Sequence, residues 1–199
     1  PMETRKSTGL IMWLAALWGA GIAHAQAPPP DQQVAAAGHA APDAMQAGAA
    51  VKGYNEASEL VTLREGSNEL ICVADEPGDD RFHVACYHKR LEPFMQRGRD
   101  LRAEGVDPAA VDSIRRAEIE RGALDLPSHP MALYSLTGPA DSYDAAADSV
   151  SGASPLYVVY TPFATGEELG LPTRPTGNVP WLMEPGTPWA HIMITSGGN

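Results

Sequence analysis

The stretch from Ile71 to Arg90 holds the residues whose chemistry is easiest to name. It contains both cysteines of the chain, Cys72 and Cys86, and two of its six histidines, His83 and His88. Such a set can form a disulfide, a metal site, or a cysteine nucleophile with a histidine base. The compartment decides between them, because thiols oxidise outside the cytosol.

The first 25 residues have the features of a signal peptide. Arg5 and Lys6 supply a basic start, and an uncharged apolar run from Leu10 to Ile22 follows. This run has the length of the hydrophobic part of a signal peptide and is short for a membrane span. Ala23-His24-Ala25 then places small residues where signal peptidase reads them. We therefore expect cleavage before Gln26 and an exported protein, periplasmic or secreted, with no integral membrane segment after cleavage.

Export favours a disulfide between Cys72 and Cys86, because two cysteines in one exported chain usually pair. The alternative is a metal site held by His83, Cys86 and His88. A structural zinc site needs four ligands at recurring spacings, and the sequence contains no C-x-x-C or H-x-x-x-H. A cysteine nucleophile would need a free thiol in a compartment that removes free thiols. The sequence thus predicts the disulfide and no metal, with the metal site as the alternative.

The composition changes behind the predicted signal peptide. Residues 26–53 are rich in Ala, Pro, Gln and Gly and contain no Phe, Trp or Tyr. Such a segment buries too little apolar area to offset its ordering entropy, so we expect a disordered linker. Residues 54–199 should form a single globular domain. The formal net charge of −11 gives the acidic protein no electrostatic attraction for nucleic acid.

Segments rich in β-forming residues predict a sheet. Glu59–Arg64 and Glu69–Ala74 should form a β-hairpin, and Phe82–Tyr87 a third strand. Residues 91–122 have helical periodicity, with Asp107-Pro108 as the start of the second helix. Pro77-Gly78 indicates a turn, and Thr165-Gly166-Glu167-Glu168 has the form of a capping box. Further strands are expected near residues 131, 156 and 189. The predicted fold is α+β: a single domain with a mixed or mainly antiparallel sheet and two helices packed on one face.

Aromatic side chains of the last third could line a ligand pocket, or could simply form the core. The long Pro- and Gly-rich loop from Pro162 to Pro188 would be the rim of such a pocket. The candidate pocket residues are Tyr134, Tyr157, Tyr160, Trp181, Trp189 and His191.

A candidate polar site combines Arg64, Asp75 and His88. Arg64 ends one strand of the predicted hairpin and Asp75 follows the other, so that the two could pair across it. A structural salt bridge is the default interpretation of that pair. His88 precedes Lys89-Arg90, which suggests a surface position or the edge of a cleft.

The sequence contains no G-x-S-x-G, H-E-x-x-H, P-loop or dinucleotide-binding motif. The catalytic residues therefore stay unassigned, and no cofactor is predicted. We expect a non-enzymatic domain that binds a small molecule or an envelope protein. One alternative is a hydrolase or metal-dependent enzyme using His88 or His191 with Asp75. The other is a structural envelope protein without a concave site.

Three segments carry a resemblance: VTLREGSNELICVAD, YTPFATGEELG and PWLMEPGTPWAHIMI. With them the chain resembles a group of secreted bacterial hypothetical proteins of unknown function. The likeness covers about Glu59 to Ile194. It implies a bacterial, exported single domain and transfers no mechanism.

Overall fold

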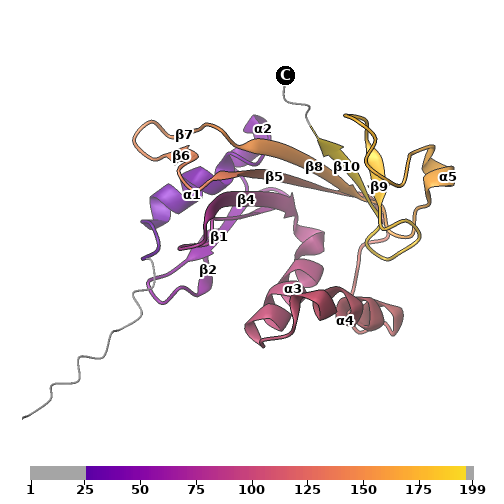
Figure 1. Ribbon diagram of the computed structural model, residues 1–199. Coiled ribbons are helices and arrows are strands. Elements are labelled where there is room, and N and C mark those ends of the chain that lie inside the picture. The colour runs from indigo at the N-terminus through magenta and orange to yellow at the C-terminus, as the bar shows by residue number, and fades with distance from the viewer. Residues whose placement is uncertain (1–25, 196–199) are drawn as a thin grey trace, which may run out of the picture.

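The computed structural model describes residues 26–195, which are built on one eight-stranded sheet (Figure 1). The strand order is β2-β1-β3-β4-β5-β8-β10-β9, and the pairs are antiparallel except for the parallel pair of β1 and β3. The predicted α+β fold is thus confirmed. The predicted signal peptide lies outside the described residues. The strands are β1 (Ala50–Tyr54), β2 (Leu60–Arg64), β3 (Leu70–Val73), β4 (Arg81–His88), β5 (Met131–Pro139), β8 (Ser154–Tyr160), β9 (Trp181–Met183) and β10 (His191–Thr195).

The segment 26–53, expected to be a disordered linker, is instead folded. It forms α1 (Pro30–Gly38), α2 (Asp43–Gln46) and most of β1. Ala36 and Ala37 of α1 are 6% and 0% exposed and pack into the main core. The expectation failed because it counted only the apolar area of the segment itself. Small alanine side chains let the helix lie close to the sheet, so that the sheet supplies the missing apolar surface.

The predicted hairpin between residues 59–64 and 69–74 is wrong, although both strands exist. β1 lies between them, antiparallel to β2 and parallel to β3. The hairpin prediction assumed that neighbouring strands in the sequence pair with each other. A strand from the supposed linker takes that central place instead.

The two faces of the sheet carry different helices. Alternate residues of a strand point to opposite faces, so the register defines both sets. One face carries Val51, Cys72, Cys86 and Tyr134, and α1 packs on it. The other carries Ile71, Tyr87, Leu133 and Val158, with α3 (Glu92–Ala103) and α4 (Pro108–Glu120) on that side (Figure 1). The two predicted helices of one face are therefore present, and α1 is an additional one.

Charged side chains fasten α3 to the sheet. Lys52 of β1 and Arg99 of α3 both pair with Glu92 at the start of α3, and the Tyr87 hydroxyl of β4 donates to the same carboxylate. Although burial opposes it, the hydrogen bonds from Lys52 and Tyr87 hold the pKa of Glu92 below its ordinary value. Glu92 is therefore a paired carboxylate with a structural role.

Local signals behave as the sequence predicts at two helix starts. Asp107 caps α4 by accepting a hydrogen bond from the Ala109 amide at 2.9 Å. Thr165 and Glu168 form a reciprocal capping box at α5 (Gly166–Leu169). Both signals lie within four residues of the helix start that they specify, so they can be recognised from the sequence alone.

The folded state of residues 30–38 has a direct test in Ala37→Leu. The added side chain would overpack the contact between α1 and the sheet, which typically costs about 1–3 kcal/mol of unfolding free energy. Ala35→Leu, at a half-exposed position of the same helix, should cost far less. Urea unfolding of both variants measures the difference. Equal, negligible effects would mean that the segment is not packed.

Candidate functional site

Cys72 and Cys86 are joined as the sequence predicts. Their sulfur atoms are 2.03 Å apart, and the two residues lie directly opposite each other on β3 and β4. Both are 0% exposed. The Ala37 carbonyl oxygen of α1 lies 3.4 Å from the Cys86 sulfur. The bridge therefore sits in the core beneath α1, and Cys86 is neither a nucleophile nor a thiolate ligand.

The alternative metal site of His83, Cys86 and His88 is not formed. Cys86 is in the disulfide, and His83 and His88 point to opposite faces because they are five residues apart on β4. Within residues 26–195 there is no group of three or more His, Cys, Asp or Glu side chains that could hold a metal ion.

The candidate polar site is scattered. Arg64 donates to the carbonyl oxygens of Ala49 at 3.1 Å and Gln46 at 2.6 Å, so it binds the connection between α2 and β1. His88 lies 3.7 Å from Glu69. Asp75 accepts a hydrogen bond from the His83 amide at 2.7 Å, at the other end of β4. Five residues of strand separate this point from His88, which is roughly 16 Å.

The hydrolase constellation of His88 or His191 with Asp75 is also absent. β5 and β8 lie between β4, which carries His88, and β10, which carries His191. This spacing puts the two histidines roughly 14 Å apart. The His191 Nδ1 lies 2.6 Å from the Trp189 carbonyl oxygen, and its ring is 5.2 Å from that of Tyr160. His191 is a satisfied, packed histidine.

The predicted aromatic pocket is wrong as a single site. Tyr134 and Tyr157 are opposite each other on β5 and β8 with rings 6.0 Å apart, whereas Tyr160 points to the other face. Trp189 is 7% exposed and packs 6.2 Å from Phe94 of α3. Trp181 belongs to the edge strand β9. These side chains pack the sheet and its helices, which was the simpler of the two interpretations.

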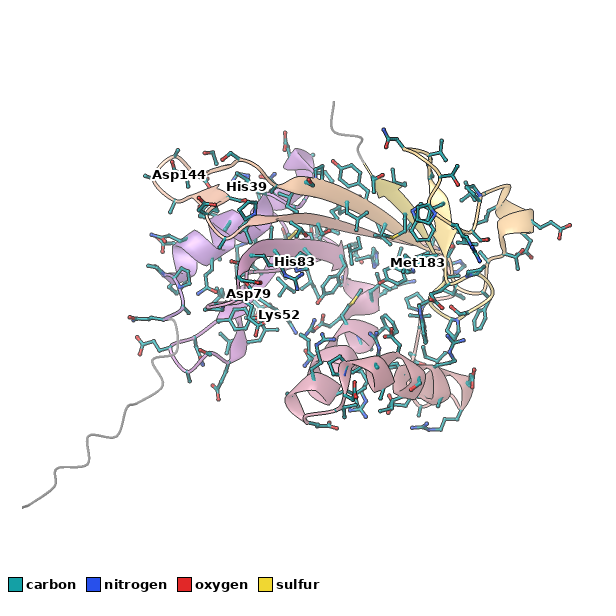
Figure 2. The ribbon with its side chains drawn as sticks, in the orientation of Figure 1. His39, Lys52, Asp79, His83, Asp144 and Met183 are labelled. Carbon is teal, nitrogen blue, oxygen red and sulfur yellow. A yellow bond between two sulfur atoms is a disulfide. The ribbon has the colours of Figure 1, made fainter. Side chains whose placement is uncertain are left out.

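A pocket of about 360 Å³ lies elsewhere, between α1, the turn from β3 to β4 and the segment that follows β5. Figure 2 labels Asp79 of that turn at the opposite end of the sheet from Met183 of β9. Its apolar surface comes from Ala36, Ala74, Phe82 and Tyr143. Its polar groups are Gln32, Gln33, Asp75, Glu76, Asp79 and Arg81.

The turn from β3 to β4 contributes three carboxylates to the lining of this pocket. Pro77-Gly78 occupies its centre, and Gly78 has a φ of 90°, which glycine adopts at little cost. Burial is the main reason that the pKa of Asp75 is raised to about 6, and the charges of Asp79 and Glu76 add to the effect. The pKa of Asp75 thus lies about two units above that of an ordinary aspartate.

The part of the lining that follows β5 is held in place by a contact with the end of α1. The Tyr143 ring of β6 (Tyr143–Asp144) stacks on Phe82 at 6.3 Å, and its hydroxyl donates to Asp148 at 3.0 Å. The same carboxylate oxygen lies 3.0 Å from His39 Nε2. The short hairpin of β6 with β7 (Ser149–Val150) is thus tied to the end of α1, beside which Figure 2 labels His39.

Sequence reasoning missed this pocket because one wall comes from the supposed linker. Gln33 is 3% exposed, accepts from the Tyr54 amide and donates to the Tyr54 carbonyl oxygen, so that α1 is locked to the end of β1. The only local signal was the Pro-Gly turn with its acidic neighbours. Nothing near Gln33 or Tyr143 in the sequence indicates that they meet.

The comparisons with known proteins leave the site to be interpreted from its geometry. No protein family, curated protein or solved structure matches the chain. In residues 26–195, none of the helices is both long enough and apolar enough to cross a bilayer.

The disulfide predicts that no thiol reacts in the native or the unfolded protein, with or without a chelator. Reduction should lower the unfolding free energy by about 3 kcal/mol, the value for a loop of this size in the chain-entropy account. A thiol titration in denaturant with and without reductant checks both points. Two thiols released by the chelator alone would contradict the bridge.

The raised pKa of Asp75 predicts a pH-dependent effect of Asp75→Asn. A carboxyl whose folded pKa lies above its unfolded value of about 3.9 stabilises the fold at low pH, and this stability is lost as pH rises through about 6. Asp75→Asn should therefore be more stable than the parent at pH 7.5, by roughly 1 kcal/mol after allowing for solvent screening. The gain should vanish below pH 4. Asp43→Asn, on exposed α2, is the control, and a gain independent of pH would contradict the assignment.

Proposed function

We propose that this protein is an exported, non-enzymatic binding domain, and that the pocket beneath α1 holds a small molecule. The pocket joins an apolar surface of Phe82 and Ala36 to a half-buried carboxylate, Asp75. This combination of apolar lining and a few placed polar groups is typical of small-molecule sites. The half-buried carboxylate is the observation that carries the proposal. Among residues 26–195 it accepts a hydrogen bond from the His83 amide and forms no ion pair, and such a charge is costly to bury.

Binding fits the pocket better than hydrolysis does. Acid–base hydrolysis by two carboxyl groups needs them on either side of the bond that breaks. Here Asp75, Glu76 and Asp79 all belong to one short turn. The lining also includes the ring of Tyr143, which can pack against a ligand but cannot activate water.

The pocket also indicates the kind of ligand. A volume of about 360 Å³ suits a compact molecule. The ligand should place an apolar group against Phe82 and Tyr143 and present a hydrogen-bond donor, such as an ammonium or a hydroxyl group, to Asp75. Because protonation removes the charge of Asp75, affinity should fall as pH drops below about 6.

Two observations support export. The Ala-His-Ala sequence before Gln26 has the form of a signal peptidase site. The disulfide between Cys72 and Cys86 is of the kind that persists in oxidising compartments.

Binding of an envelope protein is the second candidate, and a specific surface favours it. Four of the five large hydrophobic side chains that are most exposed among the described residues come from the stretch 163–183. Phe163 is 59% exposed and has a φ of 64°, an unusual conformation for a bulky residue. The structural alternative, which expected no concave site, is less favoured because the pocket exists.

Two tryptophan variants test the pocket. Ala145 is exposed and lines the pocket, whereas its neighbour Ala146 is exposed and does not. We expect a screen of small apolar amines and alcohols, read by thermal shift and calorimetry at pH 7.5, to yield ligands. Ala145→Trp should weaken their binding at least about tenfold, a loss of roughly 1.4 kcal/mol, and Ala146→Trp should not. Ligands that bind all three proteins equally would reject the pocket and favour the surface at 163–183.

A further inference from the structure

The residue expected to become the amino terminus lies at the pocket. Gln26 follows the predicted cleavage site and lines the pocket beneath α1. It also lines a second, open groove of about 690 Å³, whose other side is formed by Tyr54, Asn55, Glu56 and Leu63. The start of the mature chain would thus run between two recesses.

Hydrogen bonds hold this segment close to the pocket. The side-chain Nε2 of Gln33 donates to the Pro28 carbonyl oxygen at 2.7 Å, and the backbone amide of Gln33 donates to the Pro29 carbonyl oxygen at 3.1 Å. Consecutive prolines at 28, 29 and 30 further restrict the backbone. Gln26 is two residues before Pro28, so its backbone nitrogen stays within about 10 Å of the anchored Pro28 carbonyl oxygen.

The surroundings of Gln26 are negatively charged. Arg81 is the cation among the residues that line the two recesses, and it lies 3.9 Å from Asp79. Asp75 and Glu76 form none of the ion pairs recorded for residues 26–195. The titratable groups that line the recesses are Tyr54, Glu56, Asp75, Glu76, Asp79, Arg81 and Tyr143.

We propose that signal-peptide removal completes this site, by placing the new α-ammonium group of Gln26 beside the carboxylates of Asp75 and Glu76. Hydrolysis of the Ala25–Gln26 bond adds water, leaves a carboxylate on Ala25 and frees an amine on Gln26. That amine takes up a proton at neutral pH. The precursor has only a neutral amide at the same place. The proposal rests on the export part of the proposed function; in the mature protein a ligand's hydrogen-bond donor would share the Asp75 carboxylate with this ammonium group.

Maturation would then set the charge of the pocket mouth. An ammonium group there offsets part of the repulsion among the three carboxylates of the turn. One competing reaction would remove it: the amine of an amino-terminal glutamine can attack its own side-chain amide, forming a neutral lactam and releasing ammonia. Pairing with carboxylates keeps the amine protonated and therefore slows this attack.

The first part of the test is the intact mass of the full chain after export by a bacterial host. We expect a chain that begins at Gln26 with a free amine. A chain that begins at another residue would overturn the proposal. So would a chain that begins at Gln26 but is lighter by the mass of one ammonia.

The second part is the pKa of the α-ammonium group, measured by NMR on the ligand-free exported protein. Neutralising its partners with Asp75→Asn and Glu76→Gln together should lower this pKa by roughly half to one unit. Glu65→Gln, an exposed acid in the loop after β2, should leave it unchanged. An identical pKa in all three proteins would refute the pairing.

The two proposals fail separately. The pKa is measured without ligand, so it can fall in the double variant even if Ala145→Trp has no effect on any ligand. Conversely, the Ala145→Trp variant can still weaken ligand binding if the α-amine of Gln26 has no carboxylate partner.

Discussion

The contact between α1 and the disulfide-bridged strands is the interaction on which the rest of this structure depends. Ala36 and Ala37 bring the helix onto β3 and β4, where the bridge joins Cys72 to Cys86. Only small side chains permit this approach, because a close-packed core tolerates little extra volume. Once α1 is seated, Gln33 locks it to the end of β1. The pocket is the space left between this helix and the turns that extend past it.

Two kinds of carboxylate distinguish the structural parts from the site. Glu92 is surrounded by Lys52, Arg99 and the Tyr87 hydroxyl, and its charge is fully used in holding α3 to the sheet. Asp75 is also partly buried, but among residues 26–195 its carboxylate accepts a hydrogen bond only from the His83 amide, and burial raises its pKa. A partly buried carboxylate without an ion-pair partner adds no stability, which is why we propose Asp75, and not Glu92, as the ligand-binding carboxylate.

The features that the sequence predicts well are local or follow from the compartment. The Asp107 cap, the Thr165 capping box and the Pro77-Gly78 turn need only a few neighbouring residues. The disulfide followed from expected export and a count of two cysteines. The α+β class followed from strand and helix periodicity, and it stays correct even though the pairing of the strands was predicted wrongly. All of these signals can be evaluated before any long-range contact is known.

The failures share one cause, which is that strand order and register are properties of the whole sheet. Tyr157 and Tyr160 looked like neighbours of one pocket, but their register puts them on opposite faces. The segment that contains Gln33 looked disordered because its partner surface lies elsewhere in the chain. We propose that small molecules bind between α1 and the turn that carries Asp75. The most direct measurement is two-dimensional NMR mapping of bound fragments on the oxidised protein. We expect the shifted amides to cluster at residues 33–36, 74–82 and 140–145. A cluster at 163–183, or no cluster at all, would contradict the account.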